Sequence, residues 1–189
     1  VMRLSLDRVD LWDLRSNPTT QEKGFNFANL YALATDGSKE AWAEYTRLFD
    51  DVFTKTAYPC KITAGRLELD FGIKTENIRS KVDIQKGIAD VEIPEKGVKI
   101  ESFISATQLV GVAKVWGRYA LNIHIPEYIS GKGEEETSLH YPPAQILTDG
   151  EYMYYDQQTY TDFRYGIVVL KKDFEGYSEL YFTIATNNE

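Results

Sequence analysis

The chain has 189 residues, of which 43% are hydrophobic and 26% are charged, and its formal net charge is −8. This length and composition predict one folded domain over residues 1–189 and exclude extended disorder. The negative charge would repel a phosphate backbone, so we expect no nucleic-acid partner. No run of about 18 apolar residues occurs, so we also expect no membrane insertion.

Alternation of apolar and polar residues predicts antiparallel strands that bury one face and leave the other in water. It runs through residues 2–7, 66–71, 78–84, 98–104, 119–125 and 179–184. Residues 166–170 are apolar on both faces and are expected in the middle of a sheet. Glycine-containing breaks at residues 94–97, 116–118 and 173–176 predict hairpins. About ten strands at short spacing predict a mainly β, antiparallel sandwich.

One amphipathic surface helix is predicted at about residues 38–55, where apolar residues recur with helical spacing. They are Ala41, Trp42, Tyr45, Leu48, Phe49, Val52 and Phe53. Ser38 is the expected N-cap, and Glu40 falls in the first turn. We expect this helix to lie across one sheet face or to close one end of the sandwich.

Two stretches, residues 14–28 and 127–145, are predicted to be long loops, because they are rich in polar residues or glycine. The second holds an acidic run at residues 131–136, which we interpret as a solvated tip.

The sequence offers few groups for catalysis. The two histidines, His124 and His140, lack metal-ligand spacing to other histidines, cysteines or carboxylates. The single cysteine, Cys60, is predicted to be a small buried residue. Neither a nucleophile elbow nor a phosphate-binding loop is present. We therefore expect no catalytic residue, metal or cofactor in this chain.

The segment of residues 7–15 follows a predicted strand and is unusually rich in charge. Its candidate contact residues are Asp7, Arg8, Asp10, Trp12 and Asp13. Sugar-binding sites use these residue types, because an aromatic face contacts the sugar ring and charged groups bind its hydroxyls. Interfaces between domains and between proteins use the same residue types. A third interpretation is an ion-paired turn with Trp12 in the core.

A second cluster of aromatic residues lies at Tyr152, Tyr154 and Tyr155, with Tyr160, Phe163 and Tyr165 after it. Such rings could form a platform on which a sugar stacks. Sheet faces and sandwich cores favour the same residues, so a purely structural role is the alternative.

Residues 4–15 (LSLDRVDLWDLR) resemble a signature in the N-terminal domain of glycoside hydrolases related to families 95 and 65. There the segment often reads L-x-L-(D/N)-(R/E)-x-x-L-W. Residues 64–70 resemble the "G-x-L-x-(I/L)" strand of that domain, and residues 82–89 its "L-D-L-x-x-G/A-x-A" strand. These short matches cover most of the chain in order, although the family's upstream Gly-Asn-Gly stretch is missing.

The resemblance implies a super-β-sandwich followed by a linker and an (α/α)6 catalytic barrel that carries the acid and base. The strands account for this chain, so we expect an excised N-terminal portion of a periplasmic or secreted enzyme. Its partner would be the catalytic barrel domain of the same parent chain, contacted through Asp7, Arg8, Asp10, Trp12 and Asp13 at the active-site rim. The alternatives are a carbohydrate-binding module that uses Tyr152, Tyr154 and Tyr155, or a structural or oligomerising sandwich.

Overall fold

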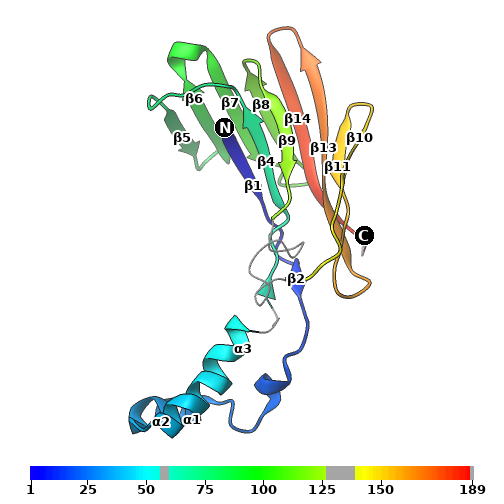
Figure 1. The fold of residues 1–189 in the computed structure, drawn as a ribbon. Helices are drawn as coiled ribbons and strands as arrows, with labels where there is room; N and C mark the ends of the chain where they lie inside the picture. Colours follow the sequence, from blue (N-terminus) through cyan, green and yellow to red (C-terminus); the bar gives the residue numbers. More distant parts are fainter. Residues whose placement is uncertain (56–59, 127–138, 188–189) are drawn as a thin grey trace.

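The computed structural model describes residues 1–55, 60–126 and 139–187, and these form two facing antiparallel sheets with a helical extension (Figure 1). The large sheet has the order β10 (Ile146–Asp149), β11 (Tyr152–Tyr155), β13 (Arg164–Phe174), β14 (Tyr177–Thr186), β8 (Gly111–Trp116), β7 (Val98–Ile104), β6 (Ile88–Ile93) and β5 (Arg79–Asp83). A short strand, β12 (Gln157–Gln158), also pairs with β13. The small sheet has the order β1 (Met2–Leu6), β4 (Gly65–Asp70) and β9 (Ala120–His124). The predicted mainly β, antiparallel fold is confirmed.

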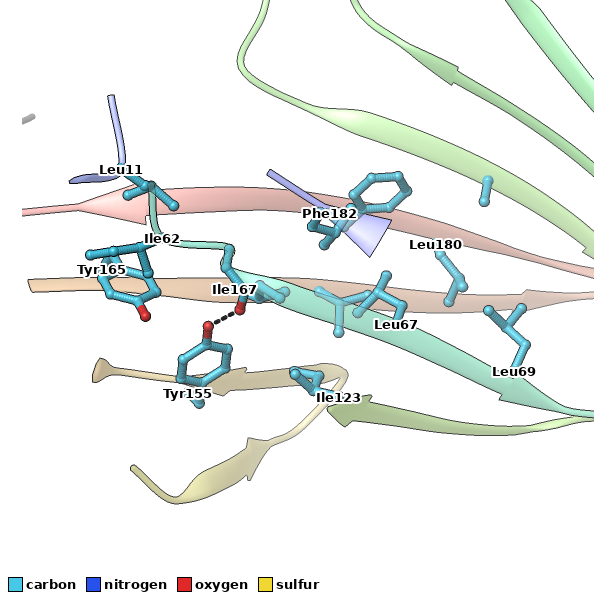
Figure 2. Close-up of a cluster of buried hydrophobic side chains, with 14 of the residues drawn as sticks. Leu11, Ile62, Leu67, Leu69, Ile123, Tyr155, Tyr165, Ile167, Leu180 and Phe182 are labelled. Carbon is cyan, nitrogen blue, oxygen red and sulfur yellow. Dashed lines mark hydrogen bonds between the residues drawn. The ribbon is translucent and has the colours of Figure 1, made fainter. Parts of the chain in front are cut away.

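The core lies between the two sheets, where Leu67 of β4 faces Ile167 of β13 and Leu180 of β14 (Figure 2). These side chains are completely excluded from solvent. Alternate residues of β4 point inward, as the period-2 pattern predicts. Each buried aliphatic side chain contributes roughly 1.5–3 kcal/mol to folding, so this layer stabilises the sandwich.

Two of the three predicted hairpins are confirmed. A short 3-10 turn, η3 (Pro94–Lys96), and Gly97 join β6 to β7, and β13 turns directly into β14. The hairpin expected at residues 116–118 is wrong, because this stretch carries the chain from β8 to β9 in the other sheet. Both edges of β8 are already paired with β7 and β14, so no edge remains for β9.

The alternation at residues 78–84 gives a strand but not a buried face. Val82 of β5 points to the same side as Val91 and Ile100, yet Val82 and Ile78 are exposed and Ile84 is 90% exposed. The small sheet packs against β7, β8, β13 and β14, and β5 lies at the far edge of the large sheet. Burial therefore fails here because no layer covers this edge.

A helical arm, defined as residues 18–54, extends away from the sandwich (Figure 1). It comprises η1 (Pro18–Gln21), α1 (Phe27–Asp36), α2 (Lys39–Tyr45), the π-helical turn η2 (Thr46–Asp50) and α3 (Asp51–Thr54). A short ladder of β2 (Trp12–Asp13) and β3 (Cys60–Lys61) joins it to the sandwich. The helix predicted at residues 38–55 is confirmed, and the side chain of Ser38 caps it by accepting from the backbone N–H of Ala41.

The expectation that this helix lies across a sheet face or closes one end of the sandwich is wrong, because the arm extends away from both sheets (Figure 1). The arm's aromatic side chains pack against one another instead. The rings of Phe25 and Phe49 lie 5.3 Å apart, and those of Trp42 and Tyr45 stack at 5.1 Å. The predicted loop at residues 14–28 contains η1 and ends where α1 begins, and α1 itself was not predicted.

The second predicted loop, residues 127–145, is described only from residue 139, so its acidic run at 131–136 lies outside the described residues. Leu139 and Tyr141 are buried in the described part. Within the described ranges, none of the helices is both long enough and apolar enough to span a membrane.

Candidate functional site

The predicted contact segment, residues 7–15, runs from the end of β1 through β2, at the junction between the sandwich and the helical arm (Figure 1). The side chains of this segment differ in their exposure to solvent. Those of Asp7 and Asp10 are about half exposed, whereas the side chain of Asp13 is buried. Trp12 is also exposed, so the interpretation that places Trp12 in the core is wrong. Its indole N–H donates to the carbonyl of Val9, 2.9 Å away.

An apolar groove of 470 Å³ opens beside the first half of this segment. We define it by its three walls, which are formed by residues 6–10, by residues 104–105 with 108–111, and by residues 182–184. Val9 is 85% exposed and Leu109 is 74% exposed, and Ile104 is also exposed. Large apolar side chains are thus gathered at the surface on more than one wall. Exposed apolar surface that is contiguous and rimmed by polar groups is typical of interaction sites.

Charged residues form the rim of the apolar groove and hold its first wall in place. The guanidinium of Arg8 lies 2.8 Å from the carboxylate of Asp10 and donates to the backbone carbonyl of Ile184 at 3.0 Å. The amine of Lys61 lies 2.7 Å from the carboxylate of Asp7. The hydrogen bond from Arg8 to Ile184 ties the segment to β14, so the first wall of the groove is attached to the large sheet.

Asp13 is the centre of a buried polar cluster, which we define as Asp13, Arg15 and Tyr141. Arg15 pairs with the carboxylate of Asp13 at 2.8 Å, and the hydroxyl of Tyr141 donates to the same oxygen at 2.6 Å. Arg15 also donates to the carbonyl of Leu139 at 2.9 Å. Asp13 was predicted to be a contact residue at the rim. The structure corrects this, because its side chain faces inward and is almost fully buried.

The environment of Asp13 shifts two pKa values. Desolvation alone would raise the pKa of Asp13, but hydrogen bonds from Arg15 and Tyr141 outweigh it and lower that pKa from its ordinary value of 3.8. Burial, together with the negative Asp13, raises the pKa of Tyr141 far above the usual tyrosine range. The cluster therefore holds an ionised carboxylate and a neutral phenol at physiological pH.

The free energy of unfolding is expected to fall as the pH drops below about 3.8. The pKa of Asp13 is lower in the folded state than in the unfolded state, so its contribution is fully present above the unfolded pKa. The contribution is lost as the pH falls through the folded pKa. Urea unfolding at a series of acidic pH values checks this against Asp13→Asn. Equal pH dependence in the two proteins would contradict the assignment.

A second hollow, the Trp12 pocket, has a volume of 210 Å³ and lies on the other side of Asp10. We define it by Asp10, Trp12, Arg15, Tyr160 and Thr161, which line it with neighbouring residues. Tyr160 is 71% exposed. The guanidinium of Arg15 lies 4.9 Å from the ring centre of Tyr160. The structure thus brings together residues from both predicted clusters, which are about 150 positions apart in sequence, a proximity that no local pattern could reveal.

The candidate stacking residues of β11 lie on opposite faces of the large sheet. Tyr155 is 2% exposed and its hydroxyl donates to the carbonyl of Ala64 (Figure 2). It belongs to the core, so its ring offers no face to a ligand, which corrects the prediction. Tyr152 and Tyr154 point to the outer face, opposite Leu170 and Val168. They do not meet Tyr155 or the Trp12 pocket, so the predicted platform is not assembled.

The cysteine and the histidines were the other groups considered for chemistry. Cys60 is only half-buried, and burial together with the charge of Asp13 raises the pKa of its thiol. His124 lies in β9 opposite Arg66. In the described part of the chain, histidine, cysteine and acidic side chains form no group of three or more that could hold a metal ion.

The chain matches no protein-family model and no curated protein sequence.

Proposed function

We propose that this chain is the non-catalytic N-terminal sandwich domain of a periplasmic or secreted glycoside hydrolase. It would dock onto the (α/α)6 catalytic barrel of the same parent protein and help shape the entrance to the active site. The observation that carries the proposal is the apolar groove, because the segment that resembles the family signature forms its first wall.

The groove has the chemistry of a docking surface for a helix. Amphipathic helices bind by laying an apolar face into a hydrophobic groove, and the outer surface of an (α/α)6 barrel consists of helices. Val9 and Leu109 stand on different walls and would contact such a face from two sides. The ion pairs Asp7–Lys61 and Arg8–Asp10 at the rim would set the orientation of the partner rather than its affinity.

The helical arm offers a second contact surface. None of the residues of α1 is buried, and Phe27 and Tyr31 are among the most exposed large side chains of the described chain. Its ten residues carry no charge before Asp36. A helix with so few charged groups exposes apolar side chains to water at a cost in free energy. Helices gain most of their stability when an apolar face packs against another surface. Docking of α1 against the barrel would supply that packing.

We expect that Val9→Glu combined with Leu109→Glu weakens binding to the separately produced barrel at least about tenfold, because a buried charge opposes docking. Ile84→Glu is the matched control, since Ile84 is equally apolar and exposed but lies outside the groove. Calorimetric titration measures the affinity, and thermal unfolding of each variant verifies that the sandwich stays folded.

Two results would contradict the proposal. One is turnover of an aryl glycoside by the purified chain alone, abolished by a point mutation within it. The other is self-association of the chain that disappears in the Val9→Glu, Leu109→Glu variant, which would make the groove an oligomer interface. The second result would favour a structural or oligomerising sandwich.

A further inference from the structure

The Trp12 pocket combines two exposed aromatic rings with polar side chains in a small concave site. Trp12 comes from β2, and Tyr160 comes from the turn between β12 and β13. Flat aromatic rings favour ligands that have a face of C–H groups, because such faces are both apolar and weakly positive. Thr161 adds a hydroxyl group to the lining of the pocket.

The polar part of the Trp12 pocket is held in place before any ligand arrives. Both carboxylate oxygens of Asp10 contact the guanidinium of Arg8, at 2.8 and 2.9 Å. An ionised carboxylate has about four lone-pair sites, so Asp10 retains capacity to accept further hydrogen bonds. Arg15 is fixed by the buried Asp13 and by Tyr141. Preorganised groups bind a ligand with a smaller entropic cost.

We propose that the Trp12 pocket binds one neutral pyranose ring. Its C–H face would contact the rings of both Trp12 and Tyr160, and its hydroxyls would donate to Asp10. This goes beyond the docking proposal, because it gives the chain a ligand of its own and would stand even if the groove docks nothing.

The volume of the Trp12 pocket and the charges that line it indicate which kind of sugar it would bind. The pocket's 210 Å³ is below the roughly 300–1,000 Å³ of sites for drug-sized ligands, so a single ring fits this site better than an oligosaccharide. Among the charged residues that line it, Asp10 and Asp13 outnumber Arg15, which disfavours an anionic sugar. The site is small and Tyr160 is 71% exposed, so we expect millimolar affinity.

Saturation-transfer difference NMR tests this proposal with the methyl pyranosides of glucose, galactose and mannose and the full chain. At least one of them is expected to receive saturation at its ring C–H protons. Tyr160→Ala is expected to weaken its binding at least about tenfold, without loss of the fold, because the Tyr160 side chain is exposed. Tyr31→Ala removes an equally exposed aromatic ring from the helical arm and is the matched control.

Absence of transfer to all three pyranosides, or unchanged binding in Tyr160→Ala, would overturn the pocket proposal. The single Leu109→Glu variant keeps the two tests separate. Leu109 lines the groove but not the Trp12 pocket, so this variant should bind the pyranoside as the unmodified chain does. A variant that loses barrel binding but keeps sugar binding would therefore support both sites independently.

Discussion

Replacing Gly166 with alanine is expected to lower the free energy of unfolding by about 3 kcal/mol or more. Gly166 lies in β13 where the partner strand passes from β11 to β12. A Cβ atom at this position would stand 1.9 Å from the backbone carbonyl oxygen of Tyr155. The clash is with backbone, so the side chain cannot relieve it by rotating. The strand must shift, which would disturb the buried Tyr155 and Tyr165 on either side.

Gly87→Ala is the matched control for this prediction. Gly87 has a φ of +66°, and no atom lies within 4 Å of a Cβ built there. Its replacement costs only the left-handed backbone penalty of about 1–2 kcal/mol. Urea denaturation of the two variants measures the difference. Equal losses in both would show that the close approach at Gly166 has no energetic weight.

Asp13→Ala is expected to destabilise the sandwich by about 3–5 kcal/mol, because it leaves the guanidinium of Arg15 buried without its countercharge. The Asp13 side chain is 1% exposed and that of Arg15 is 15% exposed. The substitution also removes the acceptor of the Tyr141 hydroxyl. Loss of these contacts would loosen β2 and its partner β3, which connect the helical arm to the sandwich.

The control for this prediction is Asp173→Asn, which breaks the Lys171–Asp173 ion pair, where the aspartate is 70% exposed. Exposed pairs contribute little because water screens them. Chemical denaturation near neutral pH should therefore separate the two variants clearly. A loss in Asp13→Ala no larger than in Asp173→Asn would show that the buried polar cluster is not a stabilising element.

The Asp13 prediction concerns the support of a candidate site, and the Gly166 prediction concerns the core of the sandwich. Asp13 fixes Arg15, which forms a wall of the Trp12 pocket. Gly166 permits the close approach of β11 and β13, on which the buried position of Tyr155 depends. A change at Asp13 would therefore alter the Trp12 pocket through Arg15 as well as directly, whereas a change at Gly166 would alter the core. Rigid elements of this kind are what hold a binding constellation in place.

Local patterns in the sequence determined the types of the elements. The alternation at residues 66–71 and 119–125 predicted β4 and β9 with their buried faces, and the glycine breaks predicted two real hairpins. Ser38 and the apolar spacing after it predicted the helix of the arm. These succeeded because strand alternation, turn conformation and helix capping act over only a few residues.

Only the tertiary structure decided which apolar faces are covered and which residues meet. Ile84 and Leu67 occupy similar alternating patterns, but only Leu67, on β4 of the small sheet, faces another sheet and is buried. Tyr154 and Tyr155 are neighbours in sequence, yet one faces outward and the other enters the core. Trp12 and Tyr160 share a pocket although they lie far apart along the chain. Which apolar faces are covered, and which distant residues meet, depends on long-range strand pairing and on the close approach of backbones at Gly166. A short stretch of sequence carries no information about either.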